Sequence, residues 1–361
     1  MLNNKVRVEN EVAAISLMKD ALSALPTRLV PDVYGWNTAT EGKGWIVEEC
    51  MHGESLSKRF SELSASQPED VLVQVAHMFK LIQNYQLPPT VTGFGGLNFD
   101  SNGQVVVGGL TIWFGGPFQT FQDMYLHIFR KQLELSETTP LVNGWEGTDL
   151  RLRFQQFLNE GMPKVLENYG NVRLTLVHRD LGKSSSRSSH SQSPSTPWTF
   201  MSLLSKARNV ENLLIDPETL QLTAILDFDF SHIASPADEY FYPFPSFHGI
   251  VAGPFEEGEQ RTLNEAQLNG FKDFKTPTSQ EEVDWNLAKT WHSALETAGV
   301  ESPADIDGID ELAAVYWFLL DVCPPYFLLP RWLKRKTIKQ QQALKKETEA
   351  NLDKYLKRWG Y

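Results

Sequence analysis

The sequence has few cysteines and no excess of basic charge. Its two cysteines, Cys50 and Cys323, lie far apart and form no CxxC pair, which argues against a disulfide framework or a zinc site and fits a reducing compartment. The formal net charge is −12 at pH 7, whereas proteins that bind nucleic acids or anionic membranes broadly need basic surfaces. We therefore expect a cytoplasmic monomer with neither nucleic acid nor a membrane as partner.

Long uninterrupted hydrophobic runs are also lacking. The first twelve residues contain no apolar stretch of signal-peptide type. The most apolar later run, 313–336, is interrupted by Asp321 and by the pair Pro324-Pro325, so we interpret it as a buried helix followed by a turn. The hydrophobic content of 41% over 361 residues, with 10 Trp and 21 Phe, is ample for a folded protein of two coupled lobes.

The spacing of apolar residues predicts a mixture of helices and short strands. Apolar residues recur at helical spacing from Val8 until Pro26 ends the pattern, so the chain opens with an amphipathic helix. The segment 44–56 contains a short apolar strand, and the pair Asn102-Gly103 indicates a hairpin turn. Further helices are expected at 70–85, 117–135 and 149–168.

Polar residues flank three short strands later in the chain. The segment "DPETLQ" between the last two strands has the Asp and Pro chemistry of a turn, which would fold these strands into a hairpin. The polar ends of all three strands are therefore expected to converge. The strands and their polar neighbours are 173–177 before His178-Arg179-Asp180, 213–215 after Asn212, and 222–226 before Asp227-Phe228-Asp229.

Metal-assisted phosphoryl transfer requires such a convergence. An aspartate accepts or orients the proton of the attacking hydroxyl, while an asparagine and a second aspartate hold Mg²⁺ against the phosphates of ATP. Asp180, Asn212 and Asp227 are the right residue types in the right order. A lone His-Arg-Asp tripeptide is weak support, but together with "NLLID" and "AILDFDFS" it predicts a kinase-type site.

At this point the chain resembles the aminoglycoside phosphotransferase family, and in particular its fungal members of unassigned substrate. The matching segments are "ENEVAAI", "GWIVEECMHGESL", "LVHRDLG", "ENLLID" and "AILDFDFSHIASPADEYFY". They span 9–242, while the rest looks similar to the family's helical lobe without a sharp motif. The resemblance implies an α+β, protein-kinase-like bilobal fold with a small nucleotide lobe and a large helical C-terminal lobe.

The resemblance also implies roles for individual residues. Asp180 looks like the catalytic aspartate and Asn212 and Asp227 like the metal ligands. Glu11 looks like the helix glutamate that pairs with an ATP-contacting lysine, with a solvated acidic residue as the alternative. Asp238 in "SPADEY" looks like the family aspartate that anchors the catalytic loop. The segment that looks like the adenine-binding hinge is Glu48, Glu49, Cys50 and Met51.

Neighbouring residues have plainer interpretations. We expect His178 to pack the loop, since Asp180 already supplies a base, and Arg179 to brace it. Asp229 follows Asp227 by two residues, and we expect it to serve the structure or the metal with its side chain on the opposite strand face.

The chain departs from the family pattern in two places. Only ten residues precede Glu11, which leaves no room for the family's glycine-rich hairpin and lysine strand, so 1–52 is predicted to be a truncated nucleotide lobe and 53–361 the catalytic lobe. In the family the asparagine follows the catalytic aspartate by five residues, whereas Asp180 and Asn212 are 32 apart. Deleting 183–209, a serine-rich stretch without acidic residues, restores the family spacing.

Three explanations of 183–209 stay open. The first is that the segment is a translated intron, since the codons for Gly-Lys-Ser can contain a splice-donor sequence. The second is a phosphorylatable basic loop. The third is that the segment marks a degenerate pseudokinase. Its composition predicts a disordered insertion in each case. We expect an ATP- and Mg²⁺-dependent phosphotransferase acting on a small-molecule hydroxyl, with impaired activity, and an inactive pseudokinase or binding protein of the same fold as the alternative.

Overall fold

A computed structural model describes most of the chain. The segment 183–209, predicted to be an insertion, lies outside the described residues. Those residues are 3–38, 44–60, 62–63, 67–112, 115–181, 211–242, 244, 247–277 and 282–361.

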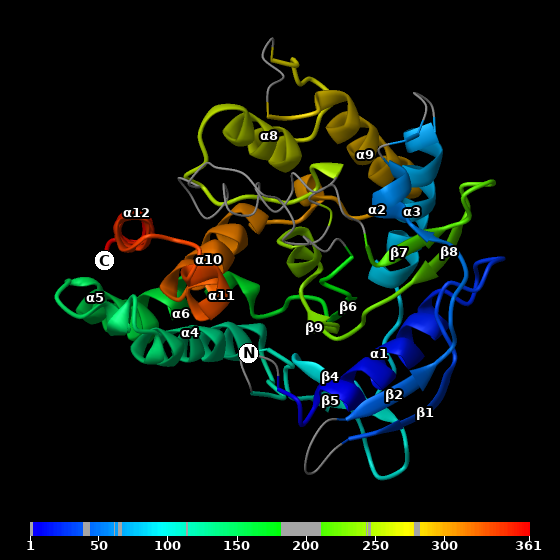
Figure 1. The fold of residues 1–361 in the computed structure, drawn as a ribbon, viewed down its shortest axis with the longest axis horizontal. Coiled ribbons are helices and arrows are strands. Elements are labelled where there is room, and N and C mark those ends of the chain that lie inside the picture. The colour runs from blue at the N-terminus through cyan, green and yellow to red at the C-terminus, as the bar shows by residue number, and fades with distance from the viewer. Residues whose placement is uncertain are drawn as a thin grey trace.

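The α+β class predicted from the sequence is confirmed, because helices dominate and the strands form small antiparallel sheets (Figure 1). The strands are β1 (Val33–Asn37), β2 (Trp45–Glu48), β3 (Glu54–Ser55), β4 (Gly96–Phe99), β5 (Val105–Gly108), β6 (Thr175–Val177), β7 (Leu213–Ile215), β8 (Leu222–Ile225) and β9 (His232–Ala234). The helices are α1 (Arg7–Ala21), α2 (Leu56–Phe60), α3 (Gln67–Gln83), α4 (Phe121–Thr138), α5 (Leu150–Gln156), α6 (Met162–Val165), α8 (Gly258–Asn269), α9 (Trp285–Ala298), α10 (Ile309–Val322), α11 (Pro330–Leu333) and α12 (Ile338–Arg358).

Most of the predicted elements occur close to their expected positions. The first helix is α1, although it ends at Ala21, several residues before Pro26. The helix expected at 149–168 is interrupted, since a π-helical turn separates α5 from α6. The turn at Asn102-Gly103 joins β4 to β5, and Gly103 has a positive φ of 76°. Strand β1 was not predicted, because three of its five residues are exposed and it lacks an apolar run.

The strand hairpin predicted near the candidate site is present. Strands β7 and β8 form an antiparallel hairpin. The carboxylate of Asp216 accepts hydrogen bonds from the backbone N–H groups of Glu218 and Thr219, at 2.9 and 2.8 Å, which fixes the turn that "DPETLQ" predicted. Strand β3 adds to the outer edge of β7, and β6 pairs separately with β9.

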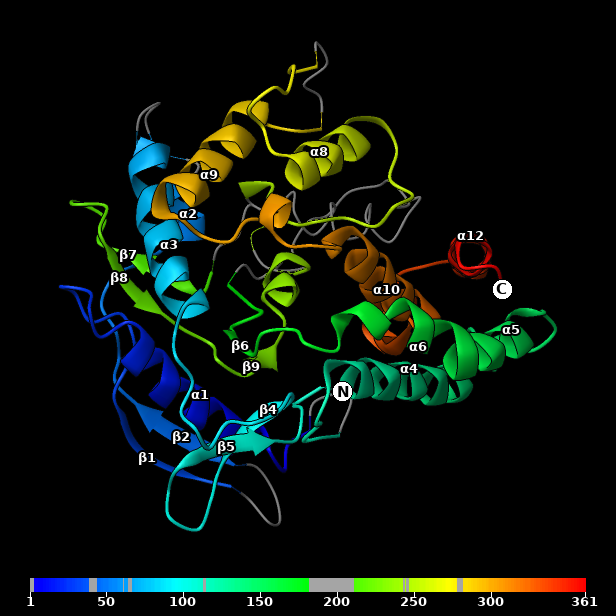
Figure 2. The same ribbon diagram turned by 180° about the vertical axis from the view of Figure 1, so that it is seen from behind.

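Helix α1 and the hairpins β1–β2 and β4–β5 gather at one end of the molecule (Figures 1 and 2). The buried side chain of Asn10 ties α1 to β4 and to the segment before β9, since its Oδ1 accepts from the N–H of Leu97 at 2.6 Å and its Nδ2 donates to the main-chain oxygen of Ser231 at 3.0 Å. The hairpin β4–β5 comes from beyond residue 52, so α1 packs on a part of the chain assigned to the other lobe. The division at 52 stays a prediction.

The main core lies among α3, α4, α10 and the strands β6 and β9, and is rich in aromatic residues. Within the described residues one stretch, Ile309–Leu328, is long and apolar enough to cross a membrane, and 78% of its most apolar window is buried inside the protein. It comprises α10 and the turn after Pro324, as the sequence indicated. The burial is that of a core helix.

Candidate active site

The loop after β6 is buried and tied to its neighbours. His178 Nδ1 accepts a hydrogen bond from the N–H of Asp180 at 3.2 Å, and His178 Nε2 lies 3.2 Å from the main-chain oxygen of Leu226. Burial lowers the pKa of His178 to about 3, so the ring is neutral at physiological pH. The histidine therefore packs the loop, and Asp180 is left as the candidate base.

Glu239, which the sequence did not single out, holds the backbone of this loop. Its two carboxylate oxygens accept the N–H groups of His178 and Arg179, at 2.7 and 2.9 Å. Burial raises the pKa of Glu239 to about 7, while the two hydrogen bonds oppose that rise. Ser235 caps the short 3₁₀ helix Pro236–Tyr240 that presents this carboxylate. Glu239 thus holds the backbone of the loop next to Asp238, the residue expected to anchor it.

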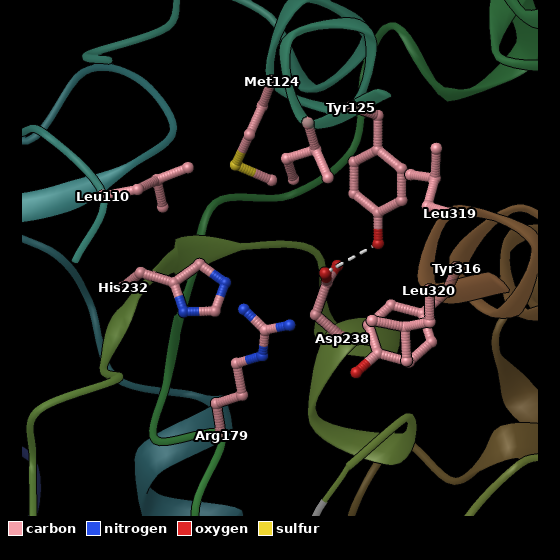
Figure 3. Close-up of a pocket in the computed structure, with 10 residues that line it drawn as sticks. Leu110, Met124, Tyr125, Arg179, His232, Asp238, Tyr316, Leu319 and Leu320 are labelled. Atoms are coloured by element: carbon pink, nitrogen blue, oxygen red, sulfur yellow. Dashed lines mark hydrogen bonds between the residues drawn. The ribbon is translucent and has the colours of Figure 1, made fainter. Parts of the chain in front are cut away.

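Asp238 contacts the loop from another side. Tyr125 donates a hydrogen bond of 2.8 Å to its Oδ1. Figure 3 shows Arg179 beside Asp238 and His232, and the guanidinium lies 5.9 Å from the ring centre of Tyr316. Burial raises the pKa of Asp238 to about 6, and both the hydrogen bond from Tyr125 and the charge of Arg179 oppose the rise. These contacts agree with the bracing role predicted for Arg179.

Asn212 lies against Asp180, although 32 positions separate them. The side-chain Nδ2 of Asn212 donates a hydrogen bond to the main-chain oxygen of Asp180, and both residues are buried. The main chain of Asn212 is fixed as well, since its oxygen accepts from the N–H of Leu226 at 2.9 Å. The described residues on both sides of 183–209 therefore keep these two candidate site residues in contact.

Asp227 follows the end of β8 with a left-handed backbone, at φ of 64°. This conformation is uncommon for a residue other than glycine and is concentrated at functional sites. Asp227 and Asp229, two positions apart, both line one cleft, which is the arrangement that strand alternation gives. The expectation that Asp229 would point to the opposite face was therefore wrong.

Acidic side chains dominate this cleft, which has a volume of about 430 Å³. Burial raises the pKa of Glu11, and the neighbouring carboxylates of Asp229, Glu48 and Asp227 add to the rise. Arg7 Nη1 forms an ion pair of 2.7 Å with Asp229 Oδ2. The cleft is therefore short of positive charge. Its lining residues are Arg7, Val8, Glu11, Trp45, Ile46, Glu48, Asp227 and Asp229.

Glu11 faces the cleft from α1, which argues against the alternative of a fully solvated residue. The basic side chain among the residues that line the cleft is that of Arg7, and it is engaged with Asp229. Lys5, the lysine nearest upstream, is exposed in the turn that precedes α1. The pairing of Glu11 with a lysine stays a prediction.

The expected hinge, Glu48 to Met51, connects the acidic cleft to the strand that follows Asn212. It leads from β2 into β3, and β3 pairs with β7, the strand that follows Asn212. The N–H of Glu49 donates to the main-chain oxygen of Asp32 at 2.8 Å, and its carboxylate pairs with Arg28. Glu49 is thus occupied in structural contacts. The main chains of Cys50 and Met51 are the better candidates to meet adenine.

The residues at the predicted metal site suit Mg²⁺ by their chemistry. Asn212 and Asp227 offer an amide oxygen and a carboxylate, which are the hard oxygen ligands that Mg²⁺ prefers. Within the described chain, no group of three or more His, Cys, Asp or Glu side chains could hold a metal by itself. At phosphate-binding sites, Mg²⁺ takes one or two protein ligands together with water and substrate phosphates. Two protein ligands are therefore sufficient.

No protein-family model matches the sequence. Two curated proteins from two strains of Aspergillus fumigatus, each described as a subtelomeric hrmA-associated cluster protein, are 33% identical to this chain over 82 residues. The alignment covers 22% of this chain and 15% of each relative, so the chain matches a small part of the relatives' length.

Several solved structures of aminoglycoside phosphotransferases align with the whole chain at low identity. The apo form of a thermostable mutant of APH(4)-Ia has a TM-score of 0.48 at 14% identity, covering 99% of this chain and 86% of that one. APH(2'')-Ib bound to ADP has a TM-score of 0.46 at 12% identity, covering 98% and 84%.

Proposed function

We propose that the chain is a kinase-like phosphotransferase that transfers the γ-phosphate of ATP to a hydroxyl group of a small molecule. The observation that carries the proposal is the contact of Asn212 with Asp180 beside the left-handed Asp227. These residues lie at the ends of three different strands. Their convergence supplies a base and two metal ligands, as phosphoryl transfer requires.

Each residue has a distinct part in this reaction. The acceptor oxygen attacks the γ-phosphorus, the bond to the bridging oxygen of ADP breaks, and the acceptor proton passes to Asp180. Asn212 and Asp227 would hold Mg²⁺, which neutralises charge on the phosphates when it is bound. Glu239 acts through the loop, because its hydrogen bonds to two successive amides fix the position of Asp180.

A phosphotransfer assay tests the proposal. The full chain is incubated with γ-labelled ATP, Mg²⁺ and a panel of small polyols and amino alcohols, and labelled product is separated. We expect slow, Mg²⁺-dependent labelling that Asp180→Ala abolishes while the fold is retained. Labelling that persists in Asp180→Ala would contradict the proposed role of this residue.

The acidic cleft favours a second candidate function, that of a nucleotide-independent binding protein with the same fold. Four carboxylates face the cleft and its lining arginine is already paired, so the phosphates of ATP would meet repulsion rather than a cation. Under this alternative MgATP neither binds nor is consumed. The location in the cytoplasm and the monomeric state expected from the sequence apply to both candidates.

A further inference from the structure

The stretch 331–346, called here the basic segment, has a charge opposite to that of the whole protein. It carries seven Lys and Arg residues and no acidic residue, within a chain of net charge −12. It comprises α11, the following turn and the first turns of α12. The basic residues are Arg331, Lys334, Arg335, Lys336, Lys339, Lys345 and Lys346.

The positive charges of the basic segment are not paired with acidic side chains in the described part of the chain. None of its seven side chains forms an ion pair with a carboxylate of the described residues. Further along α12, by contrast, Lys357 pairs with Asp353 at 2.8 Å and Arg358 pairs with Glu311 at 2.7 Å. The cations at the start of α12 are therefore available to an external anion.

Apolar side chains are exposed among these cations. Ile338, the first residue of α12, is 79% exposed, and Leu329 just before α11 is 52% exposed. The opposite face of α12 packs on the protein through Leu344, Leu352 and Leu356, which are buried. Figures 1 and 2 both place α12 at the edge of the molecule. The outer surface thus combines unpaired cations with exposed aliphatic side chains.

We propose that the basic segment docks the protein onto an anionic lipid surface. Clusters of four to eight Lys and Arg on an amphipathic helix bind anionic headgroups, and adjacent aliphatic side chains enter the acyl boundary. Nucleic acid would engage the cations but leaves no apolar environment for Ile338 and Leu329, so the exposed aliphatic residues favour lipid. The net charge of −12 describes the whole chain, and charges beyond about 10 Å are largely screened at 0.1 M salt.

Sedimentation with lipid vesicles tests this proposal on the full chain. We expect binding to vesicles that contain phosphatidylserine and none to vesicles of pure phosphatidylcholine. The triple variant Lys334→Glu, Arg335→Glu, Lys339→Glu should lose at least about a hundredfold in partitioning, since each basic residue near the surface contributes about fivefold. The matched control is Lys58→Glu, Lys272→Glu, Lys275→Glu, three exposed lysines outside the basic segment.

Both triple variants change the net charge equally, so a loss confined to the first assigns binding to the basic segment. Ile338→Ser should weaken vesicle binding by about tenfold, because it removes the side chain expected to enter the bilayer. Circular dichroism on heating checks that each variant is folded. Equal loss in both triple variants, no binding to phosphatidylserine vesicles, or binding to single-stranded DNA that is insensitive to Ile338→Ser would overturn the proposal.

Discussion

The side-chain Nδ2 of Asn212 donates a hydrogen bond to the main-chain oxygen of Asp180 across a sequence separation of 32 residues. The contact is possible because β6 and β7, which position the two residues, are fixed independently by β9 and β8. The geometry between the candidate base and the candidate metal ligand therefore depends on these strand pairs.

Asn212→Asp should weaken the fold at this contact. The new carboxylate cannot donate to the main-chain oxygen of Asp180, and both groups are buried, so we expect a loss of about 1 to 3 kcal/mol in the free energy of unfolding. Urea denaturation measures it. The control is Asn102→Asp in the exposed turn between β4 and β5, which should change stability by less than about 0.5 kcal/mol. Equal effects would show that the buried contact is not stabilising.

Removal of 183–209 should leave the fold intact. Because Asp180 and Asn212 already meet, the shorter connection should stabilise the protein by about 1.8 kcal/mol on the logarithmic closure term. The free energy of unfolding of the deletion variant, measured in urea, checks this. Failure of the shortened chain to fold would show instead that 183–209 contributes contacts to the native structure.

Glu239 should make stability fall as pH rises toward neutrality. Its pKa in the folded chain is about 7, above the ordinary carboxyl value of 4.5, so between these values the folded chain holds a proton that the unfolded chain has lost. The stabilisation from this proton is fully present below the ordinary pKa of 4.5 and is lost as pH rises through the folded-state pKa of about 7. The free energy of unfolding falls by up to about 1.4 kcal/mol per pH unit in this range.

Glu239→Gln removes this titration. The free energy of unfolding of the variant should therefore decline less than that of the native chain from about pH 5 to about pH 7. Chemical denaturation across this range measures the difference, which separates Glu239 from other titrating groups because those are common to both proteins. Parallel pH profiles would contradict the raised pKa.

Arg7→Gln should destabilise the acidic cleft. It removes the partner of Asp229 and leaves neighbouring carboxylates to repel one another, at a cost of about 1 kcal/mol that grows as pH rises and the carboxylates ionise. Arg151→Gln is the control, since Arg151 and Glu137 form an exposed ion pair worth less than about 1 kcal/mol. Thermal unfolding at two pH values distinguishes the variants. Identical shifts in melting temperature would argue against repulsion between the carboxylates of the cleft.

The candidate site residues could be predicted from the sequence, but the residues that hold them in place could not. Asp180, Asn212 and Asp227 were found because each adjoins a short apolar strand, a pattern that is visible locally. Glu239 was missed because it lies beside the more familiar Asp238 in a single 3₁₀ turn, where spacing does not reveal which carboxylate faces the loop.

The side of the strand on which Asp229 would lie was predicted wrongly for a different reason. Side chains two positions apart in a strand lie on the same face, so the opposite face expected for Asp229 did not follow from strand alternation. The cleft that Asp227 and Asp229 share is what alternation predicts for this spacing.

Calorimetric titration with MgATP tests the phosphotransferase account most directly. The native chain should bind weakly, because the described cleft offers the phosphates no free cation, and the chain without 183–209 should bind no worse. In either background Asp227→Ala should abolish the Mg²⁺-dependent part of binding, whereas Asp180→Ala should leave it unchanged. Nucleotide binding that is unaffected by Asp227→Ala, or no binding at millimolar MgATP by the folded chain, would contradict the account and favour the binding protein.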